Sequence, residues 1–249
     1  MSDFVELWTY LSTTPLFGLA STLALYLFTS AIYKKLNQHP LANPVLWTVV
    51  ILALALTLLK VPYQTYFSGA QFIHFLLGPA VVALAWPLWL KRAALMSRLP
   101  RLFMASLVGG LVSAFIAVGM AWLLDLPQYL AMSLAPKSVT APVAMGLALT
   151  LGGLPELAAI FAVLTGLIGA LLGKYIFEVI RIKKDNSGWA QRGFALGTIS
   201  HGIGAARAIQ VQPTAGAFAG LALGMQVILA SLWMPVLVWV LLWLNLTWG

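Results

Sequence analysis

The segment Pro136-Lys137-Ser138-Val139-Thr140-Ala141-Pro142 places a cation, two hydroxyl groups and two prolines within seven positions. Ser138 or Thr140 can cap a helix that follows, and Pro142 suits its first turn. The N-terminus of such a helix offers free backbone N–H groups and a partial positive charge, so together with Lys137 it predicts an anion site. The alternative is a capped interfacial turn whose Lys137 side chain extends into water.

A second polar segment, residues 197–207, reads Gly-Thr-Ile-Ser-His-Gly-Ile-Gly-Ala-Ala-Arg. On one helix Ser200, Gly204 and Arg207 would share a face. Arg207 offers a planar fork that matches a carboxylate, and Gly202 and Gly204 would let a ligand approach the backbone. His201 would titrate near neutral pH and could couple protons to transport. The alternative is that Arg207 extends to water and His201 only packs.

Other chemistry receives little support from the sequence. Asn43 and Pro142 are secondary candidates for the substrate site. The serine and histidine of Ser200-His201 point about 100° apart on a helix and have no nearby acid, so they make a poor catalytic pair. With three histidines and no cysteine, no metal cluster is apparent. We therefore predict no catalytic residues, no cofactor and no metal site.

The composition identifies the solvent of these segments. Of 249 residues, 61% are hydrophobic and 8% are charged, and the mean hydropathy is +0.96. This is far too little polar material for a water-facing surface, so a lipid bilayer must surround most of the chain. The net charge of +8 does not indicate nucleic-acid binding, because the basic residues lie in short loops between apolar runs.

The hydrophobic runs predict an all-α integral membrane protein of about six to eight transmembrane helices in one domain, residues 1–249. Residues 15–125 would form N-terminal helices and residues 135–249 a core of broken helices that holds the site. The predicted segments are 15–33, 45–59, 72–90, 102–124, 141–153, 156–173, 193–210 and 215–248, with the last one either kinked or divided at Pro235. Basic loops at 34–35, 91–101 and 174–192 would face the cytoplasm, which places the N-terminus outside.

Two segments are too short for a simple crossing. Residues 141–153 cover only about 13 positions, whereas a bilayer core of about 30 Å needs roughly 20. If residues 137–155 enter and return on one side, the basic 174–192 loop stays in the cytoplasm, so the charge pattern favours a re-entrant hairpin. Residues 193–210 repeat the pattern before the next long run. Paired broken segments indicate an inverted repeat around a substrate site at the middle of the membrane.

These motifs resemble the LrgB/CidB family. The resemblance rests on residues 135–145, Gly152-Gly153-Leu154-Pro155 and residues 197–207, with support from Asn43-Pro44, residues 66–69 and residues 79–88. It implies either a holin/antiholin-like modulator of murein hydrolase activity and autolysis, or a carrier of small monocarboxylates. Pyruvate is the implied substrate class in bacteria, and glycolate and glycerate in a plastid relative. A small LrgA/CidA-type membrane protein is the implied partner.

We therefore expect a secondary transporter of a small monocarboxylate in a bacterial inner membrane, with the holin-like role as the alternative. Lys137 and Arg207 would supply charge to the substrate, while Ser138, Thr140 and Ser200 would orient it. The expected partners are the small organic anion, the bilayer and the LrgA/CidA-type protein, with a homo-oligomer as a further option and no nucleic acid.

Overall fold

The computed structural model describes residues 16–37, 39–76, 79, 82–83 and 85–243, and all regular elements in these ranges are helical. The all-α prediction is confirmed for them. The chain divides into two compact units, Met1–Ala83 and Leu84–Gly249. The N-terminus, which we predicted to lie outside the cell, and the end of the last predicted run fall beyond the described residues.

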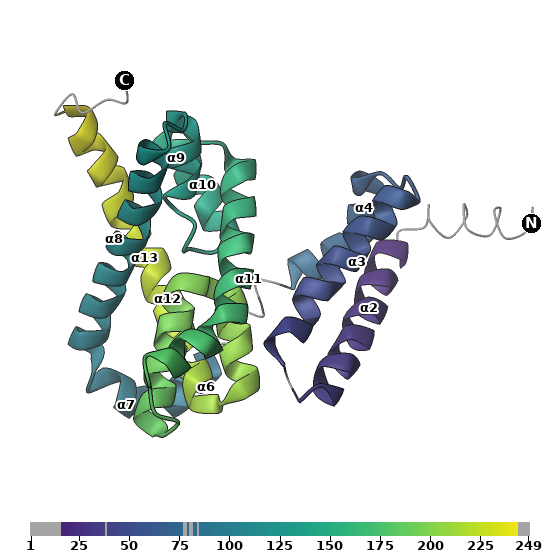
Figure 1. The fold of residues 1–249 in the computed structure, drawn as a ribbon, viewed down its shortest axis with the longest axis horizontal. Coiled ribbons are helices and arrows are strands. Elements are labelled where there is room, and N and C mark those ends of the chain that lie inside the picture. Colours follow the sequence, from purple (N-terminus) through teal and green to yellow (C-terminus); the bar gives the residue numbers. More distant parts are fainter. Residues whose placement is uncertain (1–15, 38, 77–78, 80–81, 84, 244–249) are drawn as a thin grey trace, which may run out of the picture. The chain divides into compact units, whose positions relative to one another are not determined.

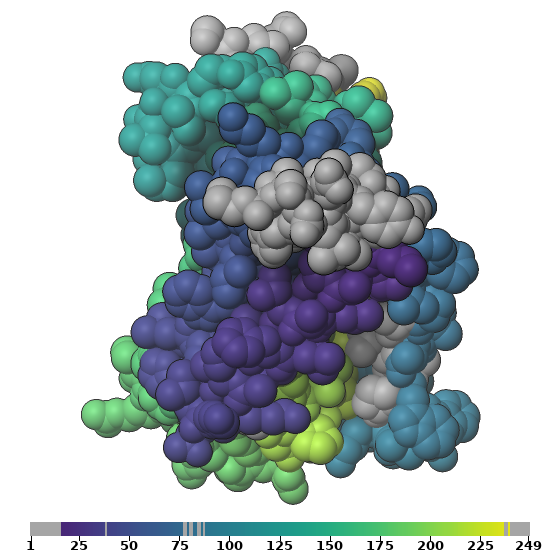
Figure 2. All heavy atoms as spheres, turned by 90° about the vertical axis from the view of Figure 1, so that its right-hand side faces the viewer, coloured from purple at the N-terminus to yellow at the C-terminus, as the bar shows by residue number. Residues whose placement is uncertain are grey.

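In its described residues, the first unit contains three helices of ten or more residues and a short connecting turn. Its elements are Leu16–Lys35 (α2), Pro40–Ala42 (η1), Pro44–Leu58 (α3) and Tyr63–Phe75 (α4). The side chains of α2 and of the following helices adjoin one another in Figure 2, and α2 contacts both α3 and α4. Hydroxyl pairs link the helices, through the buried Thr29–Thr48 contact at 2.9 Å and the half-buried Thr22–Tyr66 contact at 2.8 Å.

The third predicted span is wrong at its start. We expected a loop to precede residue 72, but α4 already begins at Tyr63 and ends at Phe75. Pro62 supplies an extended residue before the helix, and Tyr63 and Gln64 are exposed in its first turn. Several positions that follow, including 77–78 and 80–81, lie outside the described residues.

The second unit holds the remaining helices, which Figure 1 shows as a packed group. They are Ala85–Leu90 (α6), Arg92–Met96 (α7), Leu99–Leu123 (α8), Gln128–Leu134 (α9), Ala141–Leu151 (α10), Pro155–Val179 (α11), Asn186–Val211 (α12) and Pro213–Trp243 (α13). Helix α8, which we had grouped with the N-terminal helices, is thus part of this unit.

Among the described residues, four helices are long and apolar enough to cross a membrane: α2, α8, α11 and residues 213–236 of α13. Helices α3 and α10 are apolar but shorter. The protein is therefore a multi-pass helical membrane protein. A total of six to eight spans stays a prediction. Pro235 lies inside α13, which continues through it to Trp243.

The basic loop predicted at 174–192 is much shorter in the structure. Helix α11 continues to Val179 and α12 begins at Asn186, capped by the Asp185 carboxylate, which accepts a hydrogen bond from the Gly188 N–H at 2.7 Å. We missed these two helix ends because charged residues at the membrane surface look like a loop in sequence. Arg192, which we had placed in this loop, lies within α12.

After α9 the chain folds back on itself: residues 135–140 lead away from Ser133 and α10 returns to it. This unit, together with α9, is here called the first hairpin (residues 128–154). The Ser133 hydroxyl accepts a hydrogen bond from the Leu154 N–H at 2.7 Å, so the chain leaves and returns to the same point. Gly153 packs so closely that an added Cβ would lie 2.7 Å from the Ser133 nitrogen. Gly152 ends α10 in the left-handed conformation, with φ 81°. Residues 135–140, between the two helices, form the first tip.

Helix α12 also reverses direction, and is here called the second hairpin (residues 186–211). His201 has φ 39° and ψ −129°, far from helical values. Gly204 approaches Leu196, eight positions earlier, so closely that an added Cβ would lie 2.5 Å from the Leu196 carbonyl oxygen. Eight residues of straight helix would separate them by about 12 Å. Residues 186–200 and 202–211 are therefore two antiparallel arms, and residues 200–202 form the second tip.

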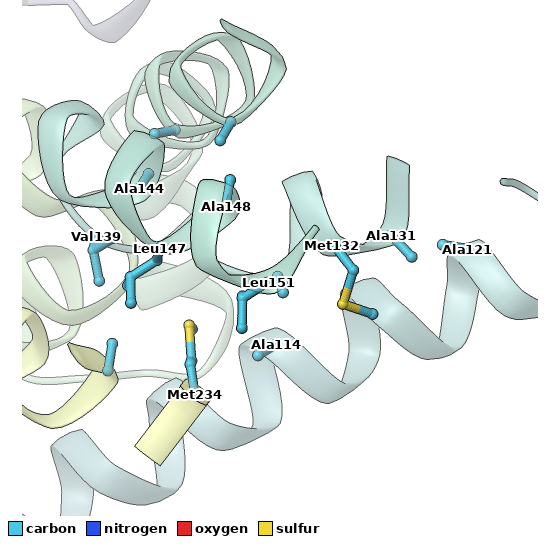
Figure 3. Close-up of a cluster of buried hydrophobic side chains, with 14 residues drawn as sticks. Ala114, Ala121, Ala131, Met132, Val139, Ala144, Leu147, Ala148, Leu151 and Met234 are labelled. Carbon is cyan, nitrogen blue, oxygen red and sulfur yellow. The ribbon is translucent and has the colours of Figure 1, made fainter. Parts of the chain in front are cut away.

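The largest apolar cluster surrounds the first hairpin (Figure 3). Val139, Leu147 and Leu151 lie on the side of the hairpin that faces Met234 of α13 and Ala114 of α8. Alanine dominates this cluster, as at Ala144 and Ala148, which are both fully buried. Small residues let helices approach closely in a membrane, where association depends on packing rather than on escape from water. The cluster therefore fixes the position of the first tip.

Candidate functional site

The first tip carries Lys137 to the middle of a membrane-spanning helix. The Lys137 Nζ donates a hydrogen bond to the Ser113 carbonyl oxygen at 3.1 Å and another to the Ser113 hydroxyl. Ser113 lies ten residues before the end of α8, Leu123, which corresponds to about 15 Å and thus to half of a bilayer core. The half-buried Lys137 ammonium is therefore positioned at depth by a neighbouring helix.

Ser138 joins the same cluster. Its hydroxyl lies 2.8 Å from the Ser113 hydroxyl, and the side chain is 3% exposed. Ser113 thus forms hydrogen bonds with both Lys137 and Ser138 of the first tip. The sequence analysis missed Ser113, because a single serine within a 25-residue apolar helix has no local motif.

The predicted hydroxyl cap of α10 is wrong. Thr140 occupies the N-cap position, but its side chain makes no capping hydrogen bond, and Ser138 contacts α8 instead. Pro142 does lie in the first turn, as predicted, and its side chain is exposed. The first-turn N–H groups of α10 therefore donate no hydrogen bond to either hydroxyl, and anion binding at this helix end stays a prediction.

The second tip docks against the middle of α11. The His201 Nε2 lies 2.7 Å from the Ala162 carbonyl oxygen, and the ring is buried. An added Cβ at Gly166 would lie 2.9 Å from the His201 ring, and one at Gly169 would lie 1.8 Å from the Ser200 hydroxyl oxygen. Gly166 is eleven residues from the start of α11, so this tip also reaches about mid-depth.

Ser200 is 1% exposed, and its hydroxyl has no hydrogen-bond partner within the described part of the chain. Ser200 therefore makes no hydrogen bond to His201. A buried hydroxyl without a partner is destabilising by about 1–3 kcal/mol, and a ligand that supplies a partner would recover part of that free energy.

The prediction that Ser200, Gly204 and Arg207 share one face of a single helix is wrong. These residues do not lie on one continuous helix, because the chain reverses at His201. Gly204 is nevertheless close to Ser200, since an added Cβ would lie 2.6 Å from the Ser200 Cβ. Gly204 and Arg207 remain three positions apart on the second arm, where Arg207 is half-buried. Gly202 begins that arm, and an added Cβ there would lie 3.9 Å from the Leu223 Cδ1, an ordinary van der Waals distance.

Asn43 has a structural task in the first unit. Its side-chain oxygen accepts hydrogen bonds from the Val45 N–H at 2.9 Å and the Leu46 N–H at 3.2 Å, which caps α3. The residue is buried. Its role as a secondary substrate residue stays a prediction.

Arg192 is a second residue that the sequence analysis misjudged. It is 5% exposed, its guanidinium donates to the Ile182 carbonyl oxygen, and it stacks over the Trp189 and Phe177 rings at 5.3 Å and 5.6 Å. These contacts hold the short connection between α11 and α12 in place. Arg192 therefore stabilises the base of the second hairpin.

The hydrogen bonds in the described ranges attach the Lys137 group to α8 and His201 to α11. Convergence of the two tips on one ligand stays a prediction. No group of three or more potential metal ligands is present among these residues.

Together these features define a class of protein: a multi-pass membrane protein with two hairpins whose polar tips contact the middle of the apolar helices α8 and α11. Comparison with known sequences then gives the family. The chain belongs to the LrgB-like family, whose model matches residues 22–240, as its motifs indicated.

Three curated bacterial relatives align over most of their length. The chain is 33% identical over 221 residues to the uncharacterized protein YxaC of Bacillus subtilis, covering 88% of this chain and 93% of the relative. It is 28% identical over 217 residues to the holin-like protein CidB of Staphylococcus epidermidis, with coverage of 87% and 93%. YwbG of B. subtilis, also uncharacterized, is 31% identical over 195 residues, with coverage of 78% and 84%. No solved structure gives a significant match.

Proposed function

We propose that this chain is a secondary transporter of a small monocarboxylate of the pyruvate, glycolate or glycerate class, working by alternating access. The observation that carries the proposal is the position of Lys137. Its amine is half-buried beside Ser113, near the middle of α8, and its hydrogen bonds in the described part of the chain go to Ser113 and to no carboxylate. A cation held at this depth without an anion is costly unless function requires it.

A carboxylate substrate would supply the missing charge. The Lys137 ammonium has three donors, of which Ser113 takes two, so one remains for a ligand. Ser138 and the free N-terminus of α10 lie beside it. We assign Arg207, Ser200, His201, Gly202 and Gly204 to the opposite wall of the same site, and Thr140 to its rim.

The pairing of two hairpins supports alternating access. In transporters, broken helices from two repeats place a site at the middle of the membrane, and one repeat moves against the other. Each hairpin here precedes a long apolar helix, α11 or α13. We propose that the two hairpin–helix units form an inverted repeat, with the N-terminus on the outside and a bacterial inner membrane as the location.

A second candidate function is a holin-like role in which the chain, with a small LrgA/CidA-type partner, modulates murein hydrolase activity and autolysis. The name of the staphylococcal relative favours this candidate over transport. A holin-like role does not require a carboxylate site in the middle of the membrane. The two candidates therefore differ in the role of Lys137.

The test is uptake of labelled pyruvate, glycolate or glycerate into proteoliposomes that contain the purified chain. Transport predicts saturable uptake of at least one acid, with competition by the others. In Lys137→Met, uptake should fall by about 10- to 150-fold, because a charge-assisted contact worth about 1.5–3 kcal/mol is lost. In Lys91→Met, which removes an exposed lysine before α7, uptake should be unchanged.

Release of a trapped neutral dye from the same vesicles tests the second candidate. A lesion former releases dye without saturation, and Lys137→Met does not alter that release. Dye release without saturable uptake of any of the three acids would overturn the transport proposal. An unchanged thermal unfolding midpoint shows that the Lys137→Met chain is folded.

A further inference from the structure

A cleft of about 450 Å³ lies between the first half of α8 and the first arm of the second hairpin. It differs from the tips in both residues and location. One end is polar and carries Arg98, Arg101, Ser187 and Gln191, at the start of α8 and of α12. The other end reaches Gly109 and Thr198. The two helices thus form the walls of a channel that changes from basic to apolar.

The inner part of the cleft is lined by hydrocarbon. Its surface comes mainly from Leu102, Ala105, Phe194 and Phe218, and the Thr198 hydroxyl is already bonded to the Phe194 carbonyl oxygen at 2.9 Å. Arg98 and Gly109 are eleven positions apart along α8, which corresponds to about 16 Å. A small carboxylate would fill only a small part of such a space and would leave the apolar surface uncovered.

The basic end is unbalanced in charge. Arg98 and Arg101 are both exposed, and no acidic residue is among the described residues that line the cleft. Nearby, Arg92 lies over the Trp89 ring at 4.3 Å, an arrangement suited to the boundary between lipid tails and headgroups. The basic end therefore lies at headgroup level, and the apolar end extends into the region of lipid tails.

We propose that this cleft binds an anionic phospholipid, with its phosphate between Arg98 and Arg101 and one acyl chain along α8 and the second hairpin. Arginine pairs recognise phosphate through paired hydrogen bonds, and basic pockets between membrane helices select anionic headgroups. The bound chain would contact Phe194 and Ala195 of the second hairpin. Because the cleft and the tips share no titratable residue, this inference stands or falls independently of the transport proposal.

The experiment is native mass spectrometry of the purified full chain in detergent, titrated with phosphatidylglycerol or with phosphatidylcholine of the same acyl chains. We expect phosphatidylglycerol to bind about 25-fold more tightly, from roughly fivefold for each of the two arginines. The Arg98→Gln/Arg101→Gln variant should abolish this preference. The Lys91→Gln/Arg92→Gln variant removes two neighbouring cations outside the cleft and should keep it.

Two further measurements test the acyl-chain part of the site. Ala105→Phe fills the apolar end at an exposed position and should weaken phosphatidylglycerol binding while the arginines remain. Free glycerol phosphate should not compete at concentrations that saturate the lipid. Equal affinity for the two lipids, loss of preference in Lys91→Gln/Arg92→Gln, no effect of Ala105→Phe, or full competition by glycerol phosphate would each overturn the proposal.

Discussion

Beyond its apolar packing, the first tip is attached to α8 by several polar side chains, whereas most of the close contacts of the second hairpin with α11 and α13 are made by glycines. Lys137 and Ser138 bond to Ser113, and Ser133 closes the base of the first hairpin. In the second hairpin, added Cβ atoms at Gly193 and Gly197 would lie 2.0 Å and 2.1 Å from the carbonyl oxygens of Ala215 and Ala219 in α13.

This difference separates two ways of holding a non-helical segment inside a membrane. Polar attachment leaves a charged group and spare donors at the first tip, which suits ligand binding. Close backbone contact excludes lipid and holds the reversal at His201, which suits a rigid wall. If the two hairpins belong to an inverted repeat, the first hairpin would bind the ligand and the second would form the rigid wall of the site.

The largest effect on stability is expected where the second hairpin contacts the backbone of α13. Gly197→Ala should lower the free energy of unfolding by about 3 kcal/mol, because neither the Ala219 carbonyl nor the added methyl can move aside. The measurement is thermal or denaturant unfolding in detergent. Gly146→Ala, in the first hairpin, has open space around its Cα and should be neutral or slightly stabilising. Equal effects at the two glycines would remove the distinction between the hairpins.

A somewhat smaller effect is expected at the second tip. Gly169→Ala should destabilise the chain by about 2 kcal/mol, because its methyl would overlap the Ser200 hydroxyl. The double variant Gly169→Ala/Ser200→Gly should recover most of this loss in the same unfolding measurement. If the second substitution adds to the first instead, Ser200 does not pack against Gly169.

In the first hairpin, Ser113→Ala removes the partner of both tip residues. It should reduce the free energy of unfolding by about 1–2 kcal/mol and raise the KM for the transported acid, because Lys137 loses its positioning bonds. Thr150→Ala is the matched control, since that exposed hydroxyl bonds only within its own helix, to Leu147 at 2.8 Å. A change in stability with an unaltered KM would limit Ser113 to a structural role.

The smallest effect is expected at the base of the first hairpin. Ser133→Ala leaves the Leu154 N–H without its partner and should cost about 1 kcal/mol of stability. Faster amide exchange at Leu154, with no change at the first tip, is the observable. Protection at Leu154 that equals wild type would show that the hairpin base is held by packing alone.

The helical class, most of the long apolar helices and the two broken segments could be predicted because hydrophobic length and Gly/Pro punctuation are local signals. Helix ends at charged boundaries could not, as α11 and α12 show, because a charged helix end at a membrane surface has the composition of a loop. The reversal at His201 was also missed. A helix that folds back on itself is revealed only by which residues touch, such as Gly204 and Leu196.

In the candidate site, too, residues with a local sequence signal could be predicted and their distant contact partners could not. Lys137, Ser138 and Ser200 were identified because polar residues are rare in apolar surroundings. Their partners were not, since Ser113 and Gly169 come from distant helices and carry no motif. Asn43 was singled out for its polarity, but in the structure it caps α3.

The most direct test asks whether one ligand reaches both tips. The chain has no cysteine, so single thiols can be introduced by Thr140→Cys in the first tip and Gly202→Cys in the second. Pyruvate, or whichever acid is transported, should slow alkylation of both thiols with the same half-maximal concentration. Protection at only one tip, or at neither, would contradict a shared carboxylate site.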